Sequence, residues 1–127
     1  MDNKSTSISS DASDQQPFVV IVSLKVKSEY LEEFLNSLNE VLDAMRLETT
    51  FVNTIACRSP DDPNSFLLFE TWLNREHFMT TELKRAYRVP HEERLGYMLL
   101  EKRELAFWTP IRGDFSFGNG WMQGTPR

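Results

Sequence analysis

Four polar side chains lie within apolar stretches of the sequence, where they could act on a bound molecule: His91, Trp72, Tyr87 and Asn53. An imidazole with its ordinary pKa near ~6.5 can accept or donate a proton at neutral pH. Tryptophan and tyrosine combine a ring that can line a pocket with an N–H or O–H that can orient a substrate oxygen. A buried asparagine amide needs hydrogen-bond partners, and a ligand oxygen could supply one.

Each of these four residues also has a purely structural interpretation. His91 stands at the start of a predicted helical segment, where it could bond to local backbone, although its spacing to apolar residues of that segment turns it inward. Trp72 and Tyr87 could fill the core, and Asn53 could bond to backbone. The residues alone leave both interpretations open.

Composition and charge exclude several other kinds of chemistry. The single cysteine, Cys57, rules out an intrachain disulfide and a multi-cysteine zinc site, and it fits a reducing compartment. His91 and His77 lack the spacing of a paired metal-ligand set. A net charge of −5 argues against nucleic acid as a partner. Because the chain has neither a spanning apolar run nor a secretory signal at its start, we expect a cytoplasmic protein without membrane contact.

The 127 residues, 40% of them hydrophobic, are enough for one globular domain with a single core. Their periodicities predict alternating strands and helices with clear turns between them. The expected elements are a strand at 18–27, a helix at 28–47, strands at 51–58 and 65–73, a helix from 74 to 87, a short helical segment after Pro90, and a strand at 102–111.

Capping residues and a proline set the expected helix boundaries. Ser28 can cap the first helix and Asn74 the second, whose apolar edge extends to Tyr87. Pro90 must end that helix, because the residue before a proline avoids the helical region. The order βαββαβ indicates a ferredoxin-like α+β fold, in which two helices cover one face of a four-stranded antiparallel sheet. The other sheet face is still apolar, so we expect a homodimer.

The two ends of the chain differ in character. Residues 1–16 are almost entirely polar and predict a disordered tail, since they bury too little surface to offset the entropy of ordering. Residues 17–112 form the expected domain. Residues 113–127 combine glycines with Phe115, Phe117 and Trp121, so we expect this extension to lie over an apolar surface of this subunit or of a partner.

The stretch RSPDDPNSFLLFETW, from Arg58 to Trp72, resembles the antibiotic biosynthesis monooxygenase (ABM) superfamily. This family of small dimeric α/β-barrel proteins includes quinol and anthrone monooxygenases. The segments 24–27, 30–34 and 74–78 are similar as well, and the likeness covers roughly residues 18–111. The resemblance implies a ferredoxin-like domain that pairs into a dimeric α/β barrel.

The resemblance further implies a cofactor-independent monooxygenase that oxidises a small aromatic substrate, such as a hydroquinone, phenol or anthrone, with O2. In that case His91 and Trp72 would be catalytic, and Tyr87 and Asn53 would bind substrate. Such a reaction needs an apolar cavity, a group that handles a proton and a donor for developing oxygen charge. No metal or other cofactor is expected.

Two departures from the family pattern keep other functions open. Many monooxygenase members carry a histidine on the second helix, where this chain has Thr81 and Ala86. The haem-degrading branch corresponds to Ser23, Thr81 and His91, of which only the histidine matches, so haem degradation is disfavoured. The alternatives are a non-catalytic dimer that binds a small ligand, and an isomerase or cyclase of an aromatic polyketide.

Overall fold

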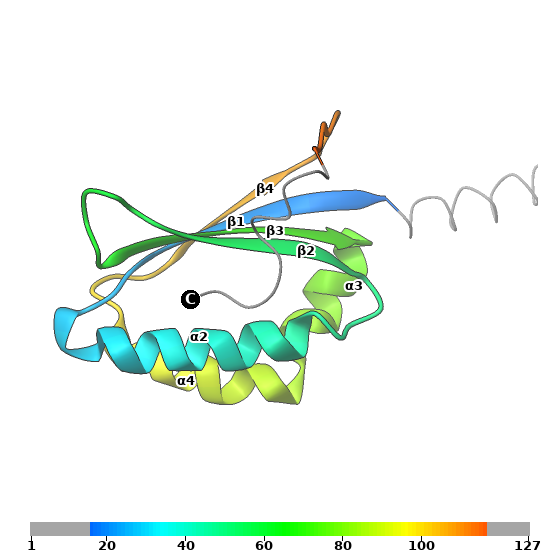
Figure 1. Ribbon diagram of the computed structural model, residues 1–127. Helices are drawn as coiled ribbons and strands as arrows, with labels where there is room; N and C mark the ends of the chain where they lie inside the picture. The colour runs from blue at the N-terminus through cyan, green and yellow to red at the C-terminus, as the bar shows by residue number, and fades with distance from the viewer. Residues whose placement is uncertain (1–15, 117–127) are drawn as a thin grey trace, which may run out of the picture.

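A computed structural model describes residues 16–116 of the chain. The predicted N-terminal tail, apart from Gln16, and most of the predicted C-terminal extension lie outside the described residues. The described chain follows the predicted order of strands and helices, shown in Figure 1.

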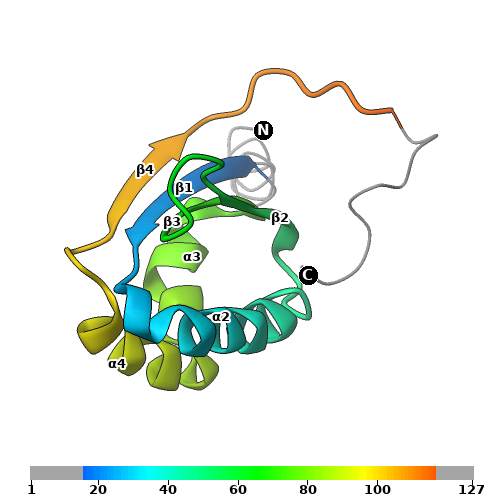
Figure 2. The same cartoon turned by 60° about the vertical axis from the view of Figure 1, so that its left-hand side comes forward.

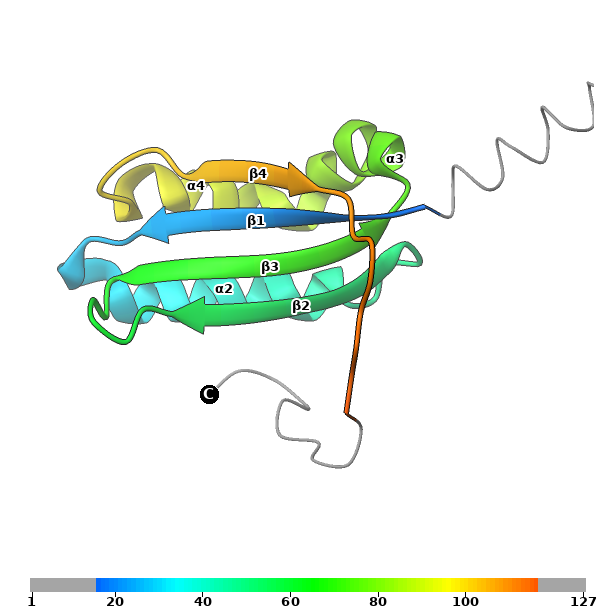
Figure 3. The same ribbon diagram turned by 90° about the horizontal axis from the view of Figure 1, so that it is seen from above.

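Four strands form one antiparallel sheet in the order β2-β3-β1-β4, which is the ferredoxin-like arrangement that the sequence predicts. Figure 3 shows this sheet from above. The β2–β3 hairpin closes through the predicted turn at 59–64, where Ser59 and Asp62 side chains accept local backbone hydrogen bonds. The strands are β1 (Pro17–Lys25), β2 (Phe51–Arg58), β3 (Ser65–Leu73) and β4 (Glu104–Trp108).

One face of the sheet is covered by α2 (Leu31–Met45) and α4 (Val89–Met98), which lie side by side beneath it in Figures 1 and 2. Shorter helical elements complete this layer: η1 (Ser28–Tyr30), α3 (Arg75–Thr80), η2 (Glu82–Lys84) and η3 (Ala86–Arg88). Alternation along β1 turns Val20, Val22 and Leu24 toward the helices, where they are buried against the apolar stripe of α2. The core therefore lies between the sheet and the helices.

The first helix begins differently from the prediction. Ser28 makes no capping bond; it starts the 3-10 turn η1, and its hydroxyl accepts a hydrogen bond from Asn64 in the hairpin turn. The helix proper runs from Leu31 to Met45 rather than from 28 to 47. The last strand is also shorter than predicted, at Glu104–Trp108.

The predicted second helix is wrong beyond Thr80. Asn74 caps α3 as expected, but the chain then breaks into the turns η2 and η3, and α4 begins at Val89. The reason is tertiary: the fully buried Glu82 carboxylate bonds to Thr50 on another segment, and the Arg88 Nε donates to the Glu82 carbonyl at 2.8 Å. These bonds replace the helical ones that local propensity would give.

Within residues 16–116, no helix lies over the other face of the sheet. The chain that follows β4 runs on this open side, opposite the helices (Figure 2), and its Ile111 and Phe115 are 96% and 72% exposed. Apolar side chains on the open face of the four strands include Ile21, Ile55, Leu67, Phe69 and Trp108.

Asn74 offers a test of how the chain enters α3. It has a φ of 59°, in the left-handed region, and its side chain accepts from the His77 backbone N–H at 2.9 Å. Asn74→Ala removes the cap and leaves in the left-handed conformation a side chain that cannot bond to local backbone. We therefore expect a loss of about 2 kcal/mol in unfolding free energy. Asn74→Gly also loses the capping oxygen, but glycine adopts the left-handed conformation without strain and is tolerated at the N-cap, so it should cost only a few tenths of a kcal/mol.

Urea unfolding of the two variants, with the exposed helix substitution Asn36→Ala as control, checks this expectation. Equal losses for Asn74→Ala and Asn74→Gly would show that backbone conformation plays no part.

Candidate functional site

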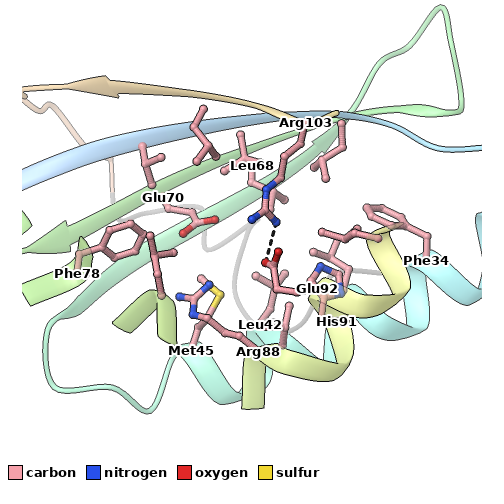
Figure 4. A pocket seen from close by; sticks show the side chains of 18 residues that line it. Phe34, Leu42, Met45, Leu68, Glu70, Phe78, Arg88, His91, Glu92 and Arg103 are labelled. Atoms are coloured by element: carbon pink, nitrogen blue, oxygen red, sulfur yellow. Dashed lines mark hydrogen bonds and ion pairs between the residues drawn. The ribbon is translucent and has the colours of Figure 1, made fainter. Parts of the chain in front are cut away.

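A cavity of about 70 Å³ lies between the sheet and the helices. Its walls are mostly apolar and come from β1, α2, α4 and the middle of β3. Five polar or charged side chains also line it, and Figure 4 shows them converging from both layers: Glu70, Arg88, His91, Glu92 and Arg103. An apolar space with a few converging polar groups is the usual form of a small-molecule site.

His91 reaches the cavity from the first turn of α4, where Pro90 starts the helix. Its Nδ1 lies 2.8 Å from the Ser37 Oγ on α2, and both residues are buried. The same Ser37 Oγ accepts a hydrogen bond from the Arg94 Nη1 at 3.0 Å. Nε2 of His91 makes no hydrogen bond with residues 16–116, and the residue lines the cavity.

Burial lowers the pKa of His91 to about 4, and the guanidinium groups of Arg103, Arg94 and Arg88 act in the same direction. The carboxylate of Glu92 opposes them. His91 is therefore neutral at physiological pH, and it is a poor proton acceptor there.

Glu70 is the better candidate for accepting a proton. It lies on β3 between Leu68 and Trp72, on the face toward the helices, and is 5% exposed. Burial raises the pKa of its carboxyl, against the opposing effects of the Trp72 hydrogen bond and of Arg88 and Arg103. A buried carboxyl with a raised pKa in a cavity is typical of acid–base sites.

Trp72 acts on the site through Glu70. Its indole Nε1 donates to the Glu70 Oε1 at 2.9 Å, and its fully buried ring packs on Phe51 and Phe78. The structure thus places Trp72 beside the cavity rather than in its wall, with its N–H holding one oxygen of the carboxyl that faces the cavity.

Arg88 supplies a buried positive charge. Its Nε donates to the Glu82 carbonyl, and its guanidinium lies 5.7 Å from the centre of the Trp72 ring. Its Nη2 is buried and has no hydrogen-bond partner in the described part of the chain. Such an unpaired donor is costly unless another molecule pairs with it, so this nitrogen can bind a ligand oxygen.

An ion pair crosses the cavity between the helical layer and the sheet. Arg103 Nη1 lies 2.8 Å from Glu92 Oε2, as the dashed line in Figure 4 shows, and both side chains are partly exposed. Exposed pairs of this kind contribute roughly 0–1 kcal/mol, so the pair can open at little cost.

Two of the four predicted site residues lie away from the cavity. The Tyr87 hydroxyl is buried beside Glu48, and burial together with that carboxylate raises its pKa to about 12. Asn53 pairs with Thr71 across β2 and β3 and faces the open side of the sheet. The structure brings His91 and Trp72 to the cavity region and leaves Tyr87 and Asn53 outside its lining.

The sequence did carry signals for the residues that prediction missed. Ser37 lies three residues after Phe34 and four before Val41, which places a hydroxyl on the apolar stripe of α2. Glu70 occupies an inward position of an alternating strand, where a carboxylate is unusual. Arg88 gave no such signal, because it lies in the turns that replaced the predicted helix.

A second hollow of about 590 Å³ lies near the hairpin end of the sheet, lined by residues such as Lys25, Arg58 and Glu104. It is larger, yet it holds none of the buried titratable groups, so we place the candidate site in the smaller cavity.

Within residues 16–116, no group of three or more His, Cys, Asp or Glu is placed to hold a metal ion. In the same range no helix has the length and apolar character needed to cross a bilayer.

The lowered pKa of His91 predicts a change of stability with pH. Between about pH 6.5 and pH 4 the unfolded chain binds a proton at this histidine and the native chain does not, so stability falls as the pH falls. The full shift corresponds to about 3 kcal/mol. His91→Gln removes this contribution. Urea unfolding between pH 7 and pH 4 should show wild type losing stability relative to the variant, whereas parallel curves would contradict the assigned shift.

Comparison with known proteins identifies the family of this chain. The sequence model of the antibiotic biosynthesis monooxygenase family matches residues 17–88. None of the curated proteins matches the chain. Structures that carry the same family name share the fold at low identity. One from Nitrosomonas europaea is 20% identical, with a TM-score of 0.68, covering 76% of this chain and 92% of its own. One from Bacteroides thetaiotaomicron is 22% identical at the same TM-score, covering 80% and 95%.

A third similar structure has a named activity. SnoaB from Streptomyces nogalater, a cofactor-independent oxygenase, is 17% identical with a TM-score of 0.68, and the match covers 77% of this chain and 96% of SnoaB. At these identities the likeness shows the fold and nothing of the substrate. The family match over more than half of the 127 residues carries the assignment. The chain belongs to the antibiotic biosynthesis monooxygenase family.

Proposed function

We propose that this protein is a cofactor-independent monooxygenase that oxidises a single-ring phenol or hydroquinone with O2. One observation carries the proposal: an apolar cavity brings together a buried carboxyl with a raised pKa, Glu70, and a buried arginine with an unpaired nitrogen, Arg88. The family membership and the oxygenase activity of the similar SnoaB support it.

The chemistry needs little from the protein. A phenolate passes one electron to O2, and the phenoxyl radical and superoxide join to form a peroxide at a ring carbon. The peroxide O–O bond then breaks with loss of water and leaves a quinone, so that a phenol and O2 become a quinone and H2O. The protein must accept the phenol proton, stabilise oxygen charge and keep bulk water out.

The residues of the cavity match these tasks. Glu70 accepts the phenol proton. Because the pKa of its carboxyl is raised, it lies closer to the pKa of the phenol that Glu70 must deprotonate. Trp72 fixes Glu70 Oε1 and leaves Oε2 for the substrate. Arg88 Nη2 and His91 Nε2 face the substrate oxygen. In this assignment Glu70 takes the proton-handling role that the sequence suggested for His91.

The size of the cavity favours one ring over an anthrone. At about 70 Å³ it has roughly half the volume of an engineered ~150 Å³ cavity that takes up benzene. A single ring therefore enters only if the walls move, and the Glu92–Arg103 pair is the weakest connection across the cavity. A three-ring substrate would require rebuilding the packing of α2 and α4 on the sheet.

We further propose a homodimer in the cytoplasm, formed by the open faces of two sheets. Apolar side chains such as Ile55, Leu67 and Trp108 are exposed there, and a second copy of the chain would cover them. Cys57 is free and exposed, as in proteins of reducing compartments.

Oxygen uptake tests the proposed activity. With hydroquinone as substrate and no flavin, metal or haem added, wild type should consume O2, and Glu70→Gln should lower turnover by about 10²-fold or more. The amide keeps the shape of the side chain and can still accept from Trp72. Glu76→Gln, an exposed change on α3, serves as the matched control and should leave turnover unchanged.

Normal turnover in Glu70→Gln would remove this carboxyl from the mechanism. Absence of uptake with a series of single-ring phenols, together with saturable quenching of tryptophan fluorescence by the same phenols, would favour the non-catalytic ligand-binding function.

Sedimentation tests the assembly. Wild type should sediment at twice the subunit mass of 14.8 kDa at micromolar concentration. Leu67→Arg places a charge on the open face and should shift the protein toward monomer, whereas Leu47→Arg, at an exposed position after α2, should not. A wild-type protein of one subunit mass would contradict the dimer.

A further inference from the structure

We propose that Arg94 and Ser37 hold the His91 imidazole in the tautomer that carries its proton on Nε2, so that the cavity binds its phenolic ligand as the oxyanion. Ser37 and Arg94 are positioning residues in this scheme, and His91 is a hydrogen-bond donor. The inference rests on the proposed function for the nature of the ligand, but the tautomer itself depends only on the protein.

Hydrogen-bond accounting fixes the direction of each bond. A guanidinium can only donate, so the Ser37 Oγ accepts from Arg94 Nη1 at 3.0 Å. The Ser37 side chain is buried, so its hydroxyl hydrogen needs an acceptor within the protein. Within residues 16–116 that acceptor is Nδ1 of His91, which lies 2.8 Å from the Ser37 Oγ. If His91 Nδ1 carried a proton, the hydroxyl hydrogen of Ser37 would lose that acceptor. The arrangement that satisfies both the hydroxyl of Ser37 and Nδ1 of His91 therefore runs from Arg94 N–H to Ser37 O–H to His91 Nδ1.

Arg94 is in turn held in place from outside. The same Nη1 contacts Glu40 Oε1 at 3.0 Å, and its two hydrogens can serve Ser37 and Glu40 at once. Because an arginine stays charged at all relevant pH values, it remains a donor, and the direction of these hydrogen bonds cannot reverse.

Burial is the main reason that the His91 ring stays neutral, and charged groups around it act in both directions. Arg94, Arg103 and Arg88 lower its pKa from α4, the chain before β4 and η3, while the carboxylate of Glu92 raises it. Burial and these three cations together lower its pKa to about 4. A neutral ring with a bonded Nδ1 presents an N–H at Nε2 rather than a basic lone pair.

Two residues that line the cavity then have a donor that is not used within residues 16–116, His91 at Nε2 and Arg88 at Nη2. Arg88 carries a full charge and has no hydrogen-bond partner at Nη2 among the described residues. A neutral phenol oxygen can accept from two donors only weakly, and the carboxylate of Glu70 in the same cavity can take the phenol proton. A phenolate oxygen accepts from both with charge-assisted bonds, which are roughly twice as strong as neutral ones. The site therefore favours the deprotonated ligand, which is also the form that reacts with O2.

Nitrogen-15 NMR reads the tautomer directly. The chain has two histidines, so His77→Gln leaves His91 as the only imidazole signal. We expect a protonated Nε2 and an unprotonated Nδ1 at pH 7. Removing the relay in this background, by Ser37→Ala or by Arg94→Leu at a partly exposed position, should give a mixture of the two tautomers. A protonated Nδ1 in the His77→Gln protein would overturn the proposal.

Ligand binding tests the consequence. The probe is para-nitrophenol, whose phenolate has its own absorption band, with nitrobenzene as the uncharged control. We expect the bound probe to absorb as phenolate at a pH where the free probe is mostly neutral. Arg94→Leu should weaken this binding by about 10-fold, the scale of one hydrogen bond to a charged group, and leave nitrobenzene binding unchanged.

Different outcomes contradict the oxyanion inference and the oxygenase function. A bound probe that absorbs as the neutral phenol, or equal losses for para-nitrophenol and nitrobenzene in Arg94→Leu, would overturn the oxyanion inference whether or not the protein consumes O2. A phenolate bound with the expected tautomer, in a protein that oxidises no phenol, would support this inference and contradict the oxygenase function instead.

Discussion

Alternation along β1 and β3 gives this sheet apolar side chains on both faces, whereas its helices form a single layer. That layer must therefore bury one whole face by itself. The helices α2 and α4 do so by packing against Val20, Val22 and Leu24 of β1. The two helices meet the sheet around a small space rather than filling it. The opposite face leaves apolar side chains such as Ile55, Leu67 and Trp108 exposed, which is the basis of the dimer that we propose.

Within this dry layer every polar group needs a partner, and the partners define the site. Ser37 joins α2 to His91 on α4, and Trp72 holds Glu70 on β3. Arg88 is bonded at Nε and unpaired at Nη2. The satisfied bonds fix the positions of the groups, and the unsatisfied ones point to the molecule that completes them. An oxygenase without a cofactor needs little more than such a fixed set of donors and one proton acceptor.

The fold could be predicted from the sequence to the extent that it rests on periodicity. The strands, the stripe of α2 and the hairpin turn all follow local rules. The break after Thr80 could not be predicted, because it depends on Glu82 bonding to Thr50, which lies far away in the sequence. Of the residues that the sequence suggested for the site, His91 and Trp72 lie at or beside the cavity. Glu70, which we propose as the proton acceptor, was hidden by the rule that charged residues lie outside. The side on which Asn53 lies could not be predicted, because both faces of β2 look similar; it lies on the open face.

The central claim is that this cavity holds the aromatic substrate. The most direct test is a crystal structure from crystals grown without oxygen in the presence of hydroquinone. The account predicts one ring between α2, α4 and the sheet, with a ring oxygen about 3 Å from the Arg88 Nη2 and the Glu92–Arg103 pair opened to admit it. A ring bound instead in the hollow at the hairpin end, or on the open face beside Asn53, would contradict it.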